Sequence, residues 1–111
     1  MPNLYEIIIS EHFSRDRGER CGRINKVLGG DWGEIICGVR NRARDTWECV
    51  TDRGLYVVLS ADKSFMITCF LSNYSKAQIL YDRAKAAMPQ ELRAQIKRNR
   101  DAYLALYNER F

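Results

Sequence analysis

The sequence predicts a single α+β domain, in which one helix precedes an antiparallel sheet of approximately four strands and two helices follow it. Its 111 residues suffice for one hydrophobic core and leave no room for a second. Short apolar runs separated by polar turns fill the stretch 35–71, and connections this short join antiparallel neighbours. On both sides of that stretch, apolar residues recur at helical spacing.

The first third combines an apolar segment with a glycine-containing helix. Residues 4–9 suit a buried strand or the entry to a helix, and Ser10 is a residue type that favours helix N-caps. A helix is then expected over 11–28. Gly18 and Gly22 weaken it, because glycine loses the most backbone freedom in a helix, so a break or turn is expected near 18–22.

Four apolar runs predict the strands of the sheet. The third and fourth are apolar on both faces, which is typical of central strands that are covered on each side. We therefore expect both to lie inside the sheet. The four runs are 35–39, 46–50, 55–60 and 65–71.

The last third predicts two helices. Ser75 is a suitable cap for a helix over 76–87. Pro89 suits the first turn of a second helix that extends to about Tyr107, because proline lacks only an N–H that is unpaired there.

Positive charge is concentrated in this last third. The chain has a net charge of +4, and residues 75–111 carry eight basic and four acidic side chains. Such a face can attract RNA, DNA or an acidic protein, although a solvated helix face has the same composition. The candidate nucleic-acid-binding residues are Arg93, Lys97, Arg98 and Arg100.

Several classes of protein are excluded or disfavoured. No apolar run approaches the roughly 18 residues of a membrane span, and the start lacks the pattern of a signal peptide, so a cytoplasmic location is expected. The four cysteines contain no C-x-x-C pair and the chain has one histidine, so we expect reduced structural thiols and neither a metal nor another cofactor.

The densest group of reactive side chains lies between residues 10 and 20. His12 can exchange protons near neutral pH, and Arg15, Arg17 and Arg20 carry permanent charge that suits phosphate oxygens. The alternative is a surface helix held by ion pairs, with an incidental histidine. Thr68 is the one hydroxyl residue in the run 65–70, where a threonine is usually a good strand former.

The order Ile9-Ser10-Glu11-His12 with trailing arginines, followed by strand 55–59 and then by Phe65-Met66-Ile67-Thr68, resembles a known family. It is similar to the small bacterial ribonuclease domains of the barnase, EndoU, colicin and RelE superfamily, especially to toxin-like members with an S-x-H start and an I-T strand. The resemblance covers about 7–71. It implies a ribonuclease-like core over about 4–71 and a helical extension over 75–108.

The resemblance implies metal-independent RNA cleavage on the face of an antiparallel sheet. His12, Thr68 and one or more of Arg15, Arg17 and Arg20 would form the site. The partner acid stays open between Glu11, a tyrosine such as Tyr56, and water. RNA and an inhibitor or antitoxin protein are the implied partners. The alternatives are a non-catalytic protein of the same fold that binds nucleic acid or protein, and a structural or regulatory accessory protein.

Overall fold

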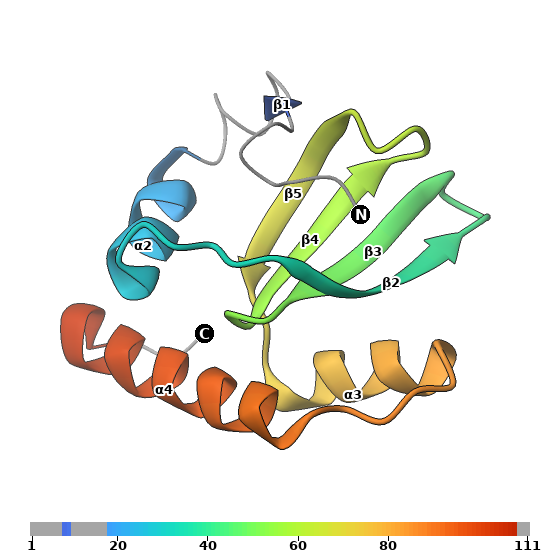
Figure 1. Ribbon diagram of the computed structural model, residues 1–111. Coiled ribbons are helices and arrows are strands. Elements are labelled where there is room, and N and C mark those ends of the chain that lie inside the picture. The colour runs from blue at the N-terminus through green and yellow to red at the C-terminus, as the bar shows by residue number, and fades with distance from the viewer. Residues whose placement is uncertain (1–7, 10–17, 109–111) are drawn as a thin grey trace.

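The computed structural model describes residues 8–9 and 18–108 of the chain. Four antiparallel strands form one sheet between a first helix and two last helices, so the predicted α+β fold class is confirmed (Figure 1). A two-residue strand, β1, adds to one edge in parallel with β5, and the strand order is β1-β5-β4-β3-β2. The elements are β1 (Ile8–Ile9), α2 (Gly18–Leu28), β2 (Ile35–Asn41), β3 (Thr46–Thr51), β4 (Leu55–Ser60), β5 (Phe65–Leu71), α3 (Tyr74–Arg83) and α4 (Gln90–Tyr107).

Helices cover the two faces of the sheet unequally. One buried cluster joins α2 to one face, and its members are Ile24, Leu28, Cys49, Leu55, Val57, Leu59, Met66, Cys69 and Leu71. A second cluster joins α3 and the first half of α4 to the opposite face, and its members are Val50, Tyr56, Ala77, Leu80, Tyr81, Leu92 and Ile96. We call these the α2 face and the α3 face. Figure 1 shows α4 running from beside α3 to below α2.

Helix α2 begins at Gly18 and continues through Gly22, so the break expected there is absent at Gly22, while the residues before Gly18 lie outside the described part of the chain. The helix runs from Gly18 to Leu28 and buries Ile24 and Leu28 against the sheet. A Cβ on Gly22 would meet nothing within 4 Å, so this glycine faces open space. The apolar stripe thus outweighs the cost of a mid-helix glycine, about 1 kcal/mol relative to alanine.

Strand β4 is central as predicted, but the prediction for β5 was wrong at its outer end. Phe65 is 44% exposed and Ile67 37% exposed. The register between β4 and β5 shifts between Val58 and Leu59, which leaves Ile67 as an extra residue in β5. A bulge of this kind bends the strand and re-aims side chains, and here Phe65 and Ile67 are open to solvent while Met66 between them stays buried.

Helix α3 begins one residue before the Ser75 that was expected to cap it. Asn73 is the N-cap, and its side chain accepts a hydrogen bond from the backbone N–H of Lys76 at 2.8 Å. The helix ends at Arg83, short of the predicted residue 87. Lys85 adopts a left-handed backbone conformation with φ of 56°, which stops the helix.

A buried polar residue fixes α4 against the β3–β4 turn. Asn99 is 2% exposed, and its Nδ2 donates to the backbone carbonyl of Arg53 at 2.7 Å. Gly54 follows with φ of +79°, and a Cβ there would lie 2.7 Å from Nδ2 of Asn99. The turn and the helix therefore fit closely only with glycine at this position.

Among the helices of the described ranges, none is both long and apolar enough to cross a membrane.

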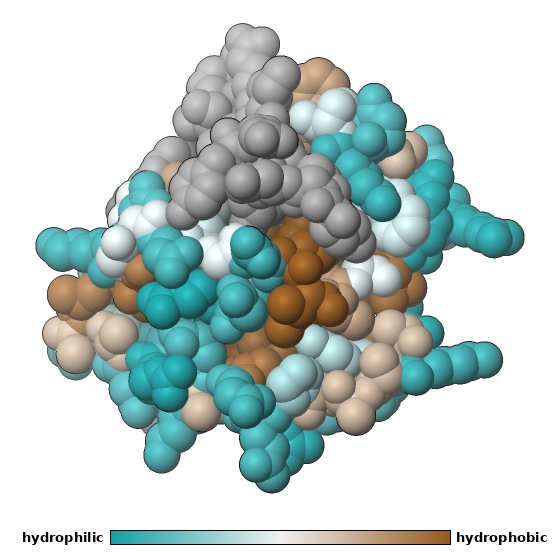
Figure 2. Space-filling view, in the orientation of Figure 1, coloured by the Kyte–Doolittle hydropathy of each residue, from teal (hydrophilic) through white to brown (hydrophobic). Residues whose placement is uncertain are grey.

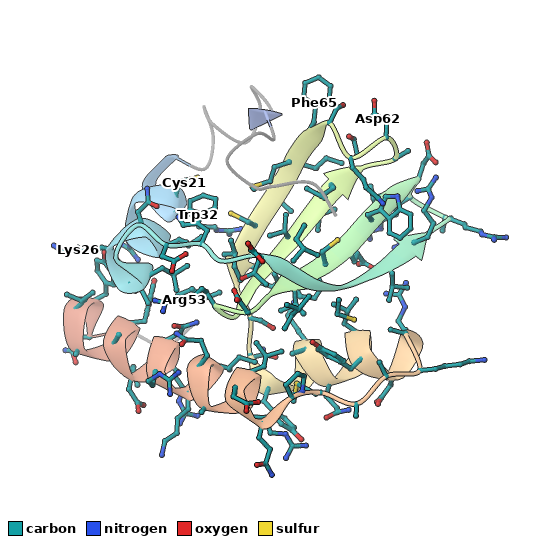
Figure 3. The ribbon with its side chains drawn as sticks, in the orientation of Figure 1. Cys21, Lys26, Trp32, Arg53, Asp62 and Phe65 are labelled. Atoms are coloured by element: carbon teal, nitrogen blue, oxygen red, sulfur yellow. The ribbon has the colours of Figure 1, made fainter. Side chains whose placement is uncertain are left out.

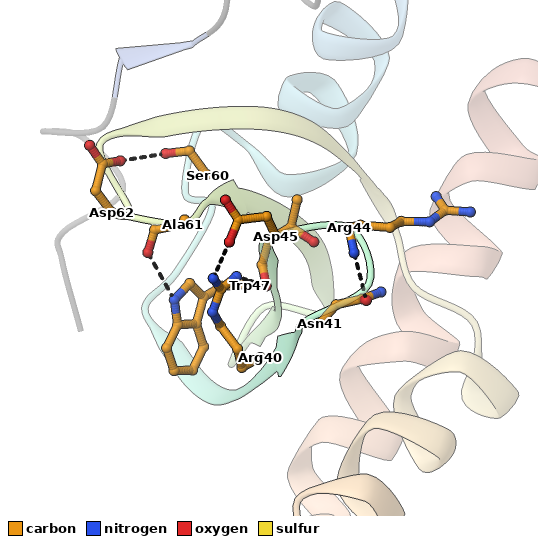
Figure 4. Close-up of polar contacts among 9 residues, drawn as sticks. Arg40, Asn41, Arg44, Asp45, Trp47, Ser60, Ala61 and Asp62 are labelled. Atoms are coloured by element: carbon orange, nitrogen blue, oxygen red, sulfur yellow. Dashed lines mark hydrogen bonds and ion pairs between the residues drawn. The ribbon is translucent and has the colours of Figure 1, made fainter.

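Contacts between turns hold the end of the sheet at which β2 joins β3 and β4 joins β5 (Figure 4). Nε1 of Trp47 donates to the carbonyl of Ala61 at 3.1 Å, which ties β3 to the β4–β5 turn. In that turn Oδ1 of Asp62 accepts hydrogen bonds from the hydroxyls of Ser60 at 2.8 Å and Ser64 at 2.6 Å. These bonds fix the connection that leads into the outer end of β5.

Candidate functional site

The predicted catalytic residues fall into two groups. His12, Arg15 and Arg17 lie outside the described residues, between β1 and α2. Arg20 lies in the first turn of α2, and Thr68 lies in β5. The predicted meeting of the histidine with an arginine and Thr68 can therefore be compared with the structure only for these last two residues.

Arg20 and Thr68 belong to opposite sides of the sheet. Cys21, which follows Arg20, packs against the cluster on the α2 face, and that cluster includes Cys69. Thr68 precedes Cys69 and pairs directly with Val58, which packs against the cluster on the α3 face. Since successive strand residues point to opposite faces, Thr68 lies on the α3 face. The structure does not bring Arg20 and Thr68 together.

Thr68 is half-buried at the end of a cross-strand row on the α3 face. Val39 pairs with Glu48, Glu48 with Val58, and Val58 with Thr68. Residues that pair directly share a face of the sheet, so the row presents one carboxylate and one hydroxyl among apolar side chains. The four residues of this row are only partly buried.

Arg83 and Tyr56 complete a polar group around Glu48. Nη1 of Arg83, at the end of α3, lies 2.5 Å from Oε2 of Glu48, and the two side chains are 39% and 21% exposed. Tyr56 lies on the neighbouring strand β4, near enough for the negative charge of Glu48 to raise the pKa of its phenol in addition to the effect of burial. We call Glu48, Tyr56, Thr68 and Arg83 the sheet-face group. It combines a carboxylate, a phenol, a hydroxyl and a guanidinium on one side of the sheet.

The environment of Tyr56 keeps its phenol protonated. Burial raises the pKa of Tyr56 to about 12, and the negative charge of Glu48 adds to the increase. The ring also stacks on Phe70 with the ring centres 4.9 Å apart. Tyr56 is therefore a fixed hydrogen-bond donor over the whole physiological pH range.

Strand β1 lies close to Thr68 along the sheet edge. Ile8 pairs with Phe65 and Ile9 with Met66, two residues before Thr68. The segment that leaves β1 in the sequence carries His12, three residues after Ile9. Phe65 projects from the end of β5 that lies away from α3 and α4 (Figure 3). This edge thus joins an exposed aromatic side chain, a half-buried hydroxyl and the strand that leads to the histidine.

The four predicted nucleic-acid-binding residues are all exposed on α4. The guanidinium of Arg93 lies 4.9 Å from the ring centre of Tyr74, Arg98 donates to Gln95 at 2.8 Å, and Arg100 lies 3.8 Å from Asp101. Among the described residues, the contact of Arg100 with Asp101 is the one pairing of these four residues with a carboxylate. The fourth residue, Lys97, makes none there. Figure 2 shows hydrophilic side chains projecting from the lower edge of the molecule, where α4 lies.

Sequence reasoning missed Glu48 and Arg83. They are 35 positions apart, and the ion pair depends on how α3 docks on the sheet, which local periodicity does not predict. One signal was present. Glu48 interrupts the apolar strand Trp47 to Val50, and a carboxylate on a strand that packs helices needs a partner.

The four cysteines are free thiols, and over residues 8–9 and 18–108 no three histidine, cysteine or acidic side chains converge as a metal site would require. No family model, curated protein or solved structure matches the chain.

Proposed function

We propose that this chain is a metal-independent endoribonuclease whose site lies on the α3 face at the β5 edge. One observation carries the proposal. Thr68 is half-buried on the same face as Glu48, Tyr56 and Arg83, and it lies two residues from the point where β1 joins the sheet. A sheet face that gathers proton-transferring and cationic side chains suits phosphoryl transfer.

The covalent chain supports a role for His12 at this place. His12 is the third residue after Ile9, and three residues of extended chain span at most about 10 Å. Ile9 pairs with Met66, and Thr68 follows two residues later on the same strand. His12 can therefore reach the β5 edge, and so can Arg15 and Arg17 with their long side chains.

The reaction needs three contributions from these residues. A base takes the proton of the RNA 2′-hydroxyl, whose oxygen attacks the adjacent phosphorus while the bond to the 5′-oxygen breaks. An acid returns a proton to that 5′-oxygen, which leaves a 2′,3′-cyclic phosphate and a 5′-hydroxyl. His12 would act as base or acid, Arg15 or Arg17 would stabilise the charge on phosphorus, and Thr68 would orient the phosphate.

The sheet-face group offers further candidates for the partner role. Tyr56 was one of the residues left open as the acid, and its protonated phenol can donate to a phosphate oxygen or hold Glu48 in place. Glu48 places a carboxylate on the same cross-strand row as Thr68. Arg83 adds positive charge beside them.

Replacement of the Thr68 hydroxyl by a methyl group of similar size tests this site. Thr68→Val should lower RNA cleavage about tenfold or more with little change in melting temperature, because it removes one hydroxyl from a half-buried position. Thr46→Val is the matched control. Thr46 lies on the α3 face of β3, and its buried hydroxyl has no hydrogen-bond partner among the described residues, so cleavage should be unchanged. Equal activity in both variants would remove Thr68 from the site.

A second candidate function, nucleic-acid binding without cleavage, is favoured by the exposed cations of α4. Arg93, Lys97 and Arg98 face solvent, and no described carboxylate pairs with them. Each Lys or Arg that neutralises a phosphate releases counterions, so the logarithm of the binding constant falls with the logarithm of the salt concentration. This function requires α4 and leaves the sheet-face group without a role.

The salt dependence of RNA binding tests the second candidate. Lys97→Gln should weaken binding of a short RNA and reduce the salt slope by about one. Arg42→Gln is the control, because Arg42 is also exposed but lies on the β2–β3 turn, away from α4. Binding that does not respond to salt, or that weakens equally in both variants, would exclude α4 as the binding surface.

A further inference from the structure

Two cysteine side chains meet between α2 and the sheet. Cys21, in the second turn of α2, packs against the buried cluster that contains Cys69 of β5. Each thiol influences the pKa of the other, and the backbones of α2 and β5 approach within 8 Å. Cys21 is marked on α2 in Figure 3. The two thiols are therefore neighbours in space although they lie far apart in sequence.

The two thiols have unequal environments. Cys69 is completely buried, whereas Cys21 is only partly buried. Burial raises the pKa of both thiols, and it does so more strongly for Cys69, which is fully buried. The charge of Arg20 favours the thiolate at both positions, and Cys21 is the one that is only partly buried. Cys21 is thus the more accessible and the more nucleophilic of the two.

We propose that Cys21 and Cys69 form an oxidisable pair that closes to a disulfide when the protein meets a peroxide. The sulfur of Cys21 attacks one oxygen of hydrogen peroxide, the O–O bond breaks, and Cys21 becomes a sulfenic acid as the first water leaves. The sulfur of Cys69 then attacks the sulfenic sulfur, and its proton leaves with the hydroxyl as a second water. Two thiols are oxidised and one peroxide is reduced.

The disulfide would fix α2 to β5. It joins positions about 50 residues apart, and closing a long loop restricts the unfolded chain more than closing a short one. Cys69 follows Thr68, and Cys21 lies in the helix that follows the His12 segment. The pair therefore links the two parts of the chain that carry the proposed catalytic residues, although its formation does not depend on that function.

The test compares the full chain before and after exposure to hydrogen peroxide. We expect the monomer mass to fall by about 2 Da, since two hydrogen atoms leave, and peptide mapping to find Cys21 joined to Cys69. The melting temperature should rise by at least about 5 °C in the oxidised protein and return after reduction. The reaction should take minutes to hours, because burial disfavours both thiolates.

Two variants give the proposal its controls. Cys21→Ser should abolish the mass change and the thermal shift, while Cys37→Ser, at a partly buried cysteine of the α3 face, should retain both. The proposal is overturned if the oxidised protein keeps four free thiols. It is also overturned if the disulfide joins Cys37 or Cys49, or if it links two chains.

Discussion

Glu48 on β3 and Arg83 at the end of α3 form an ion pair across the α3 face of the sheet, 2.5 Å apart. The pair joins a helix that follows the sheet to a strand in its middle. Burial and the charge of the same carboxylate raise the pKa of Tyr56, and Thr68 lies on the same cross-strand row as Glu48. The ion pair thus places charged groups among the mainly apolar side chains of the α3 face.

Removal of Arg83 should destabilise the protein modestly. Arg83→Met leaves the Glu48 carboxylate with less compensation, and we expect a loss of about 1 kcal/mol because both groups are partly exposed and screened by solvent. Urea unfolding measures the loss. The double variant Glu48→Gln/Arg83→Met should lose less than the sum of the two single variants. Strict additivity would mean that the ion pair contributes no coupling energy.

Asn99 should contribute more to the free energy of unfolding than any other polar residue of α4. Asn99→Ala removes the hydrogen bond to the carbonyl of Arg53 and the one from Gln95, both 2.7 Å long, and leaves buried groups unpaired. We expect a loss of about 2 kcal/mol in urea unfolding. Arg100→Ala, at an exposed neighbour, should stay within about 0.5 kcal/mol of the parent. Equal effects would show that α4 does not depend on this contact.

Asp62 should make thermal stability depend on pH in acid. Hydrogen bonds from the hydroxyl and the backbone N–H of Ser64, and from the hydroxyl of Ser60, lower the pKa of Asp62 from its usual 3.8 to about 2. A lowered carboxyl pKa stabilises the fold above the unfolded value and loses that effect as pH falls toward the folded value. Asp62→Ala should therefore lower the melting temperature at pH 7, and the difference should shrink between pH 4 and 2. A difference that stays constant over this range would contradict the assignment.

The fold could be predicted from the sequence because the periodicities are local. Alternation and turn residues predicted the four antiparallel strands, and helical spacing predicted α4 to its end at Tyr107. The break expected at Gly22 was predicted wrongly, because glycine propensity is a local property whereas the packing of Ile24 on the sheet is not. The exposure of Phe65 was also missed, since a bulge changes the register without a clear sequence signal.

The candidate site could be predicted only in part. Thr68 was singled out from its strand, but the face on which it lies depends on which side of the sheet α2 covers. That arrangement separates Thr68 from Arg20, which was one of three arginines left open. The ion pair of Glu48 with Arg83 needs the docking geometry of α3, which short-range patterns do not contain.

Cleavage of a labelled RNA in the presence of EDTA tests the central claim most directly. The parent protein should cut RNA to products with 2′,3′-cyclic phosphate ends, and its expression should be toxic to cells. His12→Ala should lose about 100-fold or more of the activity and abolish the toxicity. Arg20→Gln should reduce cleavage less than Arg15→Gln or Arg17→Gln, because Arg20 lies in the helix that covers the other face. RNA left uncut by the parent protein, or cut equally by His12→Ala, would contradict the account.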